Sequence, residues 1–210
     1  MKAVTACLTI FAFGLLRWAG ASNSTSSSAV VNHCKRNLVN NSFMEAGYTG
    51  YWSPITGGAL GNATGVRNSK AIRYSNRTAN SDGVAYHAKQ LMDLSCLSPG
   101  ATYEISAYFK LFNRTDGSPA ACNPSKDCPK VRVLLQDKAN RVIIQKYLSG
   151  YVLRGNVWNR VGYNRFRQTF ALPDSTAWDG TVKVWKIHVR NFPKEYDIAI
   201  DNFRLRKLDR

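Results

Sequence analysis

The sequence predicts an all-β fold, a β-sandwich of about eight to ten antiparallel strands. Two observations carry this prediction. Apolar and polar residues alternate with a period of two in one segment after another, and turn-forming pairs such as Asp116-Gly117 and Asp179-Gly180 separate these segments. Repetition that would indicate a propeller or a solenoid is absent. With 210 residues and 44% hydrophobic composition, the chain is long enough for one domain with a full core.

The clearest strand runs from Thr102 to Phe112. Its odd-numbered positions, from Tyr103 to Leu111, are apolar and predict the core face, whereas its even-numbered positions, Tyr108 among them, predict the outer face. Further strands are expected at residues 37–39, 70–75, 84–91, 130–136, 141–148, 165–172, 181–189 and 197–205. The long irregular stretch from Asn113 to Pro129 predicts a loop on one rim of the sandwich, and such loops are often functional.

The N-terminus is typical of a secretory signal peptide. Lys2 precedes an apolar stretch over residues 3–16, and the small residues Ala19-Gly20-Ala21 follow it, so cleavage is expected near Ser22. An uncleaved signal anchor is the alternative. We therefore expect a signal peptide at residues 1–21, a flexible Ser/Asn-rich leader at 22–32 and the folded domain at 33–210, in a secreted, extracellular protein. The rest of the chain has no apolar run of membrane-spanning length.

Four cysteines remain beyond the expected signal peptide: Cys34, Cys96, Cys122 and Cys128. An even number of cysteines in an exported chain favours disulfides, and three pairings are open. Cys122 and Cys128 flank a turn-rich segment short enough to close locally, which favours pairing 122 with 128 and 34 with 96. A zinc site is the competing interpretation, but no Cys-x-x-Cys pair occurs.

Five Asn-x-Ser/Thr sequons independently support export and predict N-glycosylation. They begin at Asn23, Asn40, Asn62, Asn76 and Asn113.

The chain is strongly basic, with 29 Lys and Arg residues against 13 Asp and Glu and a formal net charge of +16. Such an excess attracts polyanions over a long range, and outside the cell these include acidic polysaccharides. A solvated strand face is the simpler interpretation of the same charges. Nucleic acid is not expected as a partner, because no recognition helix or aromatic-basic motif is visible.

Three local patterns occur in order along the chain. The first is Asn37-Leu38-Val39-Asn40-Asn41-Ser42-Phe43, followed by Glu45 and Tyr51-Trp52; the second is Leu97-Ser98-Pro99-Gly100-Ala101-Thr102-Tyr103; the third runs from Tyr196 to Leu205 around Asp201-Asn202. Together they resemble the carbohydrate-binding modules of families 4 and 9, over about residues 37 to 208. These modules are galactose-binding-like sandwiches, so the resemblance implies a galactose-binding-like jelly roll as the form of the predicted β-sandwich. One departure is Met44, which stands between the phenylalanine and the acidic residue and moves that residue to the opposite strand face.

The resemblance implies a structural Ca²⁺ that joins the opening turn to the last strand. Calcium takes six to eight hard oxygen ligands, and Glu45 and Asp201 are the matching carboxylates. Alternatively, Asp201 caps a turn or pairs with Arg204, and Glu45 is solvated.

The resemblance also implies a sugar ligand. Sugars need flat apolar rings for their C–H faces and a few amides or charges for their hydroxyls. The candidate rings are Tyr86, Tyr108, Trp178 and Trp185, and the candidate polar partners are Gln90, Gln136 and Arg132. Packing in the core is the competing role for each of these rings.

Catalytic patterns are weak in this sequence. Its three histidines stand in no His-x-x-x-His pattern, no Gly-x-Ser-x-Gly occurs, and only three glutamates are available for an acid–base pair. The sequence therefore favours a secreted, non-catalytic domain that recognises a polysaccharide or cell-wall glycan, with an acidic glycan as one option. A surface or adhesive structural glycoprotein that binds another protein is the alternative, and a glycan hydrolase the third.

Overall fold

The structure is a computed structural model that describes residues 34, 37–39, 52–79, 82–87, 94–174, 178 and 180–208. For residues 85–87 it describes the backbone only. Several predictions fall outside the described residues: the signal peptide, the leader, Glu45, Gln90 and the sequons at Asn23 and Asn40.

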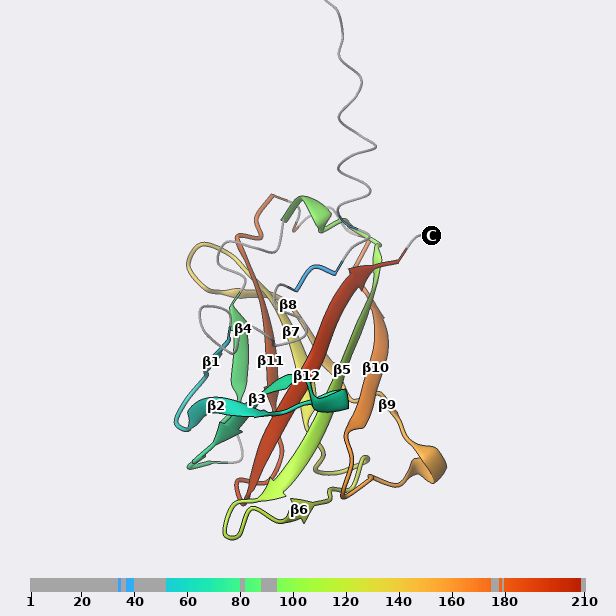
Figure 1. Cartoon of the computed structure of the whole chain (residues 1–210). Coiled ribbons are helices and arrows are strands. Elements are labelled where there is room, and N and C mark those ends of the chain that lie inside the picture. Colours follow the sequence, from blue (N-terminus) through green and yellow to red (C-terminus); the bar gives the residue numbers. More distant parts are fainter. Residues whose placement is uncertain are drawn as a thin grey trace, which may run out of the picture.

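The strands form two antiparallel sheets that pack face to face (Figure 1). One sheet has five strands, in the order β1 (Trp52–Pro54), β4 (Val84–His87), β11 (Val184–Arg190), β7 (Lys130–Gln136) and β8 (Val142–Leu148). The other has seven: β2 (Ala59–Thr64), β3 (Lys70–Ser75), β12 (Tyr196–Lys207), β5 (Thr102–Asn113), β10 (Asn164–Ala171) and β9 (Tyr151–Val152) in that order, with β6 (Pro119–Ala120) paired to β5. This arrangement confirms the predicted all-β sandwich.

Strand β5 lies in the middle of the seven-stranded sheet and shows why the pattern folds this way. Tyr103, Ile105, Phe109 and Leu111 are fully buried, as the alternation predicts, because successive side chains of a strand point to opposite faces. The ring of Tyr103 meets the edge of Trp185 from the five-stranded sheet, with ring centres 5.5 Å apart. Each such buried ring stabilises the fold by roughly 1.5–3 kcal/mol.

Most expected strands are present with small shifts at their ends. The predicted ranges 70–75 and 130–136 coincide with β3 and β7. Residues 37–39 do not form the expected strand, because the Asn37 side chain takes part in the local hydrogen bonding: its Oδ1 accepts from the N–H groups of Val39 (3.1 Å) and Leu205 (2.9 Å). The strands β1, β6 and β9 had no clear sequence signal, since alternation needs several residues to show. Strand β2 has six residues, but its sequence ALGNAT lacks an apolar–polar alternation of large side chains.

Both predicted disulfides are confirmed. Cys34 pairs with Cys96 and Cys122 with Cys128, with Cα–Cα distances of 5.2 and 5.1 Å. The first joins the chain before β1 to the buried Cys96 in the segment that precedes β5, and the second closes a local loop on the rim. Because their sulfurs are paired, these cysteines do not act as thiolate ligands for zinc.

Three short 3-10 turns complete the described elements: η1 (Val66–Asn68), η2 (Leu94–Cys96) and η3 (Arg154–Asn156). No helix in the described part of the chain is both long and apolar enough to cross a bilayer.

Candidate functional site

The outer face of the five-stranded sheet carries a run of polar side chains. On β7, Arg132 alternates with Val131 and Val133, which are fully buried in the core. Cross-strand pairing places Arg132 between His188 of β11 and Tyr147 of β8. The next outward-facing set of residues paired across the strands consists of Lys186 of β11, Leu134 of β7 and Gln145 of β8.

Three of these side chains form a small cluster at the β8 edge, which we call the β8-edge cluster: Arg132, Gln145 and Tyr147. The Arg132 guanidinium lies over the Tyr147 ring, 5.4 Å from its centre, and its Nη2 donates a hydrogen bond to Oε1 of Gln145. Tyr147 is 52% exposed. The cation therefore positions both a ring and an amide at an accessible edge.

The centre of the same face is closed. Leu134, Gln136 and His188 lie on outward rows, yet they are only 3%, 8% and 8% exposed. Gln136 donates from Nε2 to the Asn140 carbonyl at 2.7 Å, and its buried Oε1 has no hydrogen-bond partner among the described residues. The open part of the face is thus its β8 edge.

The cluster has the components of a sugar-binding surface. An exposed phenol ring offers a flat apolar face to pyranose C–H groups, and an amide and a guanidinium offer donors and an acceptor to hydroxyl groups.

Sequence reasoning found only part of this cluster. Arg132 was a predicted site residue, whereas Gln145 and Tyr147 were missed. A signal for them was present, because Ile144 and Leu148 are the buried alternates of β8 and leave positions 145 and 147 facing outward.

Two predicted binding rings are in the interior and correct the expectation for them. Trp185 is 1% exposed and shares its inward row with Ile187 and Val189. Trp178 is 6% exposed, and its carbonyl accepts hydrogen bonds from the N–H and the hydroxyl of Thr181. Neither ring presents a face to a ligand, because packing in the core uses it.

The remaining predicted residues do not converge on the β8-edge cluster. Tyr108 faces outward as expected, but on the seven-stranded sheet, where it pairs with Arg165 and Asp201. Tyr86 pairs through its backbone with Trp52 and Ile187, and its side chain is outside the described atoms. The predicted residues thus lie on both sheets of the sandwich.

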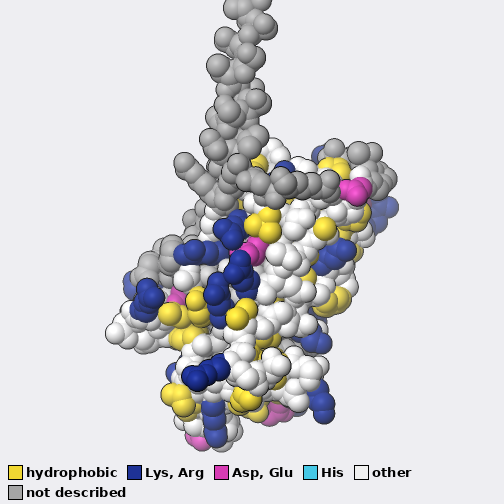
Figure 2. Space-filling model, turned by 90° about the vertical axis from the view of Figure 1, so that its right-hand side faces the viewer, with side chains coloured by type: hydrophobic (Ala, Val, Ile, Leu, Met, Phe, Trp, Pro, Cys, Tyr) yellow, Lys and Arg dark blue, Asp and Glu magenta, His cyan; other side chains and the backbone are white. Residues whose placement is uncertain are grey.

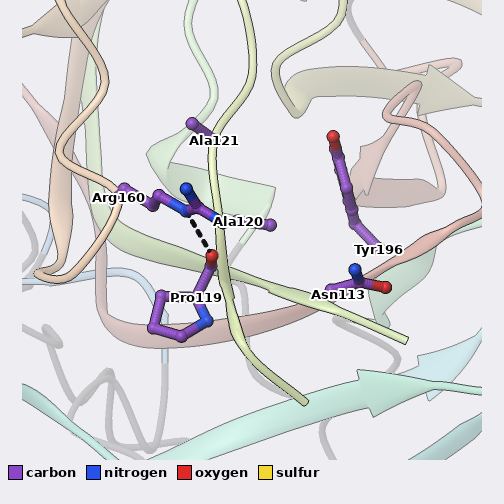
Figure 3. Close-up of a pocket in the computed structure, with 6 residues that line it drawn as sticks. All are labelled: Asn113, Pro119, Ala120, Ala121, Arg160 and Tyr196. Carbon is purple, nitrogen blue, oxygen red and sulfur yellow. Dashed lines mark hydrogen bonds between the residues drawn. The ribbon is translucent and has the colours of Figure 1, made fainter. Parts of the chain in front are cut away.

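Shallow hollows lie among the loops of the described residues, and three of them have volumes of about 260, 420 and 490 Å³. The 113–129 stretch contributes to two of them, including one of about 490 Å³ lined by Asn123, Ser125 and Ser149, among others. Figure 3 shows the smallest, of about 260 Å³, where Arg160 Nε donates to the Pro119 carbonyl at 2.7 Å while Asn113 and Tyr196 line the other side. These hollows have polar and apolar linings but lack an exposed ring arranged like Tyr147.

Each buried carboxylate in the described part of the chain accepts at least one hydrogen bond, although Oδ1 of Asp197 accepts none there. Glu104, Asp82, Asp197 and Asp201 accept hydrogen bonds from arginines, hydroxyls or backbone N–H groups. Burial alone raises the pKa of Glu104, but the hydrogen bonds and charges of Arg167 and Arg206 outweigh it and hold the pKa below its usual value. Hydrogen bonds from Thr56 and the backbone of Ala79 hold the pKa of Asp82 well below its usual range. A general acid of a glycosidase needs the opposite shift.

The surroundings of Asp201 are those of a hydrogen-bonded carboxylate. Its Oδ2 accepts from the Val66 N–H at 2.7 Å and from the Ser69 hydroxyl at 2.8 Å, and its Oδ1 accepts from the Asn202 N–H at 2.6 Å. These donors do not fit a Ca²⁺ cage, which requires oxygen lone pairs. Because Glu45 lies outside the described residues, the calcium site stays a prediction.

Three sequons lie in the described part. Asn62 and Asn76 are exposed, whereas Asn113 is half-buried and lines the hollow of Figure 3. Glycosylation of these residues stays a prediction.

Comparison with known proteins places the fold. No family model matches the sequence, and no curated protein matches it. Solved structures do match. The CBM22-1 xylan-binding domain of Paenibacillus barcinonensis Xyn10C superposes with a TM-score of 0.54 and 13% identity, covering 83% of this chain and 93% of that one. The CBM22-2 domain of the same protein gives 0.53 and 13%, covering 79% and 96%.

The chain has the jelly-roll sandwich fold of these carbohydrate-binding modules. The fold also occurs within larger proteins, such as the bacteriophage CBA120 tailspike protein 4, where the match covers 82% of this chain and 21% of that one at a TM-score of 0.53 and 13% identity. The carbohydrate-binding modules among these structural neighbours are of family 22, so the finer resemblance to families 4 and 9 is not confirmed.

Proposed function

We propose that this chain is a secreted, non-catalytic carbohydrate-binding domain that holds a polysaccharide at the β8-edge cluster. The observation that carries the proposal is the exposed Tyr147 ring, fixed beside Gln145 by the Arg132 guanidinium. A ring held in place in the free protein loses little conformational entropy when it stacks on a sugar, so more of the contact energy contributes to affinity.

Three further observations support it. The structures that share this fold include domains described as xylan-binding, so xylan is the first neutral polysaccharide to test. The formal charge of +16 favours glycans that also carry anionic groups. The lowered pKa of Glu104 and of Asp82 supports a binding role over a hydrolytic one, because neither carboxyl is available as a proton donor near neutral pH.

The test is affinity electrophoresis in gels that contain soluble xylan, run at low and at high salt. We expect retardation that survives high salt, because stacking and hydrogen bonds to hydroxyls are screened much less than exposed charges. Tyr147→Ala should weaken binding by about fivefold or more, the equivalent of about 1 kcal/mol of lost ring contact.

Tyr108→Ala is the matched control, because it removes an outward-facing tyrosine from the opposite sheet. Thermal melts of both variants show whether either has lost its fold. Loss of retardation in Tyr108→Ala together with normal retardation in Tyr147→Ala would move the site to the other sheet. Release of reducing sugar by the unmodified protein would instead identify a hydrolase.

A further inference from the structure

A second polar surface lies on the opposite side of the sandwich. Arg165 and Arg167 of β10 and Arg204 and Arg206 of β12 are all exposed on the outer face of the seven-stranded sheet. Figure 2 shows basic side chains gathered around an acidic one on this side of the molecule. We call these four residues, with the half-buried Ser106 between them, the arginine surface.

The strand register sets the layout of this surface. Ser106 of β5 pairs with Arg167 on one side and with Arg204 on the other. Because neighbouring strands lie about 4.8 Å apart, the two arginine-bearing strands are roughly 10 Å apart, with the Ser106 hydroxyl between them. Long guanidinium side chains reach across such a distance, so donors from β10 and β12 can meet above Ser106.

A single carboxylate holds two of the arginines in place. Nη2 of Arg167 lies 2.6 Å from Oε2 of Glu104, and Nη2 of Arg206 lies 2.9 Å from Oε1 of the same side chain. The Nε atoms of both arginines donate to the same oxygens, at 2.7 and 3.0 Å. Each guanidinium thus uses one edge on Glu104, while its side chain stays 45% or 49% exposed.

The turn between β2 and β3 borders the arginine surface and adds a further cation. Asp201 fixes this turn through Val66 and Ser69, and the Tyr163 hydroxyl donates to the Thr64 carbonyl at 2.7 Å. A Cβ at Gly65 would lie 2.5 Å from Oδ2 of Asp201, so the close approach of turn and sheet requires glycine there. Within the turn, Arg67 is exposed.

We propose that the arginine surface binds the sulfate groups of a sulfated polysaccharide. Glu104 accepts from Nε and Nη2 of Arg167 and of Arg206, so each guanidinium keeps N–H groups on Nη1 and Nη2 that this carboxylate does not use. These N–H groups belong to strands on either side of β5, so they can approach a ligand above Ser106 from two directions. A sulfate ester has three terminal oxygens that point in different directions, so it can accept from β10, from β12 and from the Ser106 hydroxyl at once.

This inference rests on the proposed function only in taking a glycan as the partner. The two surfaces belong to opposite sheets, and the β8-edge cluster is expected to bind neutral chains at high salt. A failure to bind xylan would therefore not contradict sulfate binding at the arginine surface. Likewise, a failure to bind dextran sulfate would not contradict xylan binding at the β8-edge cluster.

The test compares three probes with one backbone: dextran sulfate, carboxymethyl dextran of equal charge density, and unmodified dextran. Binding is measured at about 0.15 M salt, where the Debye length is about 8 Å and distant charges are screened. We expect dextran sulfate to bind at least fivefold more tightly than carboxymethyl dextran and unmodified dextran to show no charge-dependent binding. Equal binding of the two anionic probes, or no binding of dextran sulfate, would overturn the proposal.

The double variant Arg165→Gln/Arg204→Gln removes two charges and leaves both Glu104 ion pairs intact. Its affinity for dextran sulfate should fall about tenfold, because charge-assisted hydrogen bonds are lost. The matched control, Lys138→Gln/Arg141→Gln, removes the same charge from two exposed residues in the turn between β7 and β8 of the five-stranded sheet and should change the affinity less than twofold. An equal loss in both variants would show that net charge alone is responsible and would contradict the assignment.

Discussion

The two outer faces of the sandwich both carry arginines on alternating strand positions, yet they hold them in different ways. On the five-stranded sheet, Arg132 contacts a ring and an amide. On the seven-stranded sheet, Arg167 and Arg206 share the nearly buried carboxylate of Glu104. The first arrangement uses the cation to present neutral groups, and the second uses an anion to present cations. The groups around a basic residue, more than its charge, therefore indicate which ligand it suits.

The largest effect is expected from removing the charge of Glu104. In Glu104→Gln, two neighbouring guanidiniums lose their shared counterion, so the free energy of unfolding should fall by about 2 kcal/mol; the value is at the low end for buried pairs because the arginines are half-exposed. Urea unfolding measures this, with the exposed Glu195→Gln as the control. An unchanged midpoint in Glu104→Gln would mean that Glu104 does not organise this face.

The same carboxylate makes the seven-stranded sheet sensitive to acid. Because the pKa of Glu104 is lower in the folded chain than its ordinary value of 4.5, its contribution is present above that pH and is lost as the pH falls through the folded value. The free energy of unfolding should thus fall less between neutral and acidic pH in Glu104→Gln than in the unmodified protein, as measured by unfolding curves at each pH. Parallel pH profiles would contradict the ion pairs described above.

The stability of the seven-stranded sheet should also depend on alkaline pH, through the hydroxyl group of Tyr74. Burial, with a smaller effect of Asp82, raises the pKa of Tyr74 from 10.0 to about 12, and its hydroxyl donates to the carbonyls of Thr56 and Gly57. Stability from this group is complete below pH 10 and is lost as the pH rises through about 12. Tyr74→Phe should lower the free energy of unfolding by about 1 kcal/mol at neutral pH. It should also reduce the further decrease of this free energy at alkaline pH, as measured by denaturation at each pH. An alkaline profile identical to that of the unmodified protein would be the opposing result.

The smallest effect on stability is expected on the five-stranded sheet. Arg132→Ala removes one cation–π contact and one side-chain hydrogen bond at an open edge, so the free energy of unfolding should change by about 1 kcal/mol or less. Xylan affinity should nevertheless fall, because Tyr147 and Gln145 lose the group that fixes them. Full xylan affinity in Arg132→Ala would show that Arg132 is not needed to position Tyr147 for binding.

Much of the fold could be predicted from local patterning, and the site only in part. Alternation along residues 102–112 identified the buried face of β5, since the period of a strand is a local property. The same rule accounts for two errors on the five-stranded sheet: Trp185 was expected to face a ligand, and Tyr147 was missed. It places Trp185 inward with Ile187 and Val189, and Tyr147 outward, once the inner rows of β11 and β8 are fixed. Sequence patterning alone leaves open which face of a strand meets the core when both faces carry apolar residues, as with Val184 and Trp185 in β11 and Ile143 and Ile144 in β8.

Sheet membership was the second missing element. Tyr108 and Arg132 both face outward, but β5 and β7 belong to different sheets, so the two residues lie on opposite sides of the molecule. Strand order depends on contacts between distant segments, such as those of β12 with both β3 and β5, and these leave no signal in the local pattern.

The most direct test maps both ligands on one protein by NMR chemical-shift perturbation, with a neutral xylo-oligosaccharide added in one titration and a sulfated oligosaccharide in another. We predict that the neutral sugar shifts backbone signals of β7 and β8 around residues 132, 145 and 147, while the sulfated sugar shifts those of β5, β10 and β12 around Ser106. Shifts on a single face for both sugars, or neutral-sugar shifts that avoid β8, would contradict the account of two differently built surfaces.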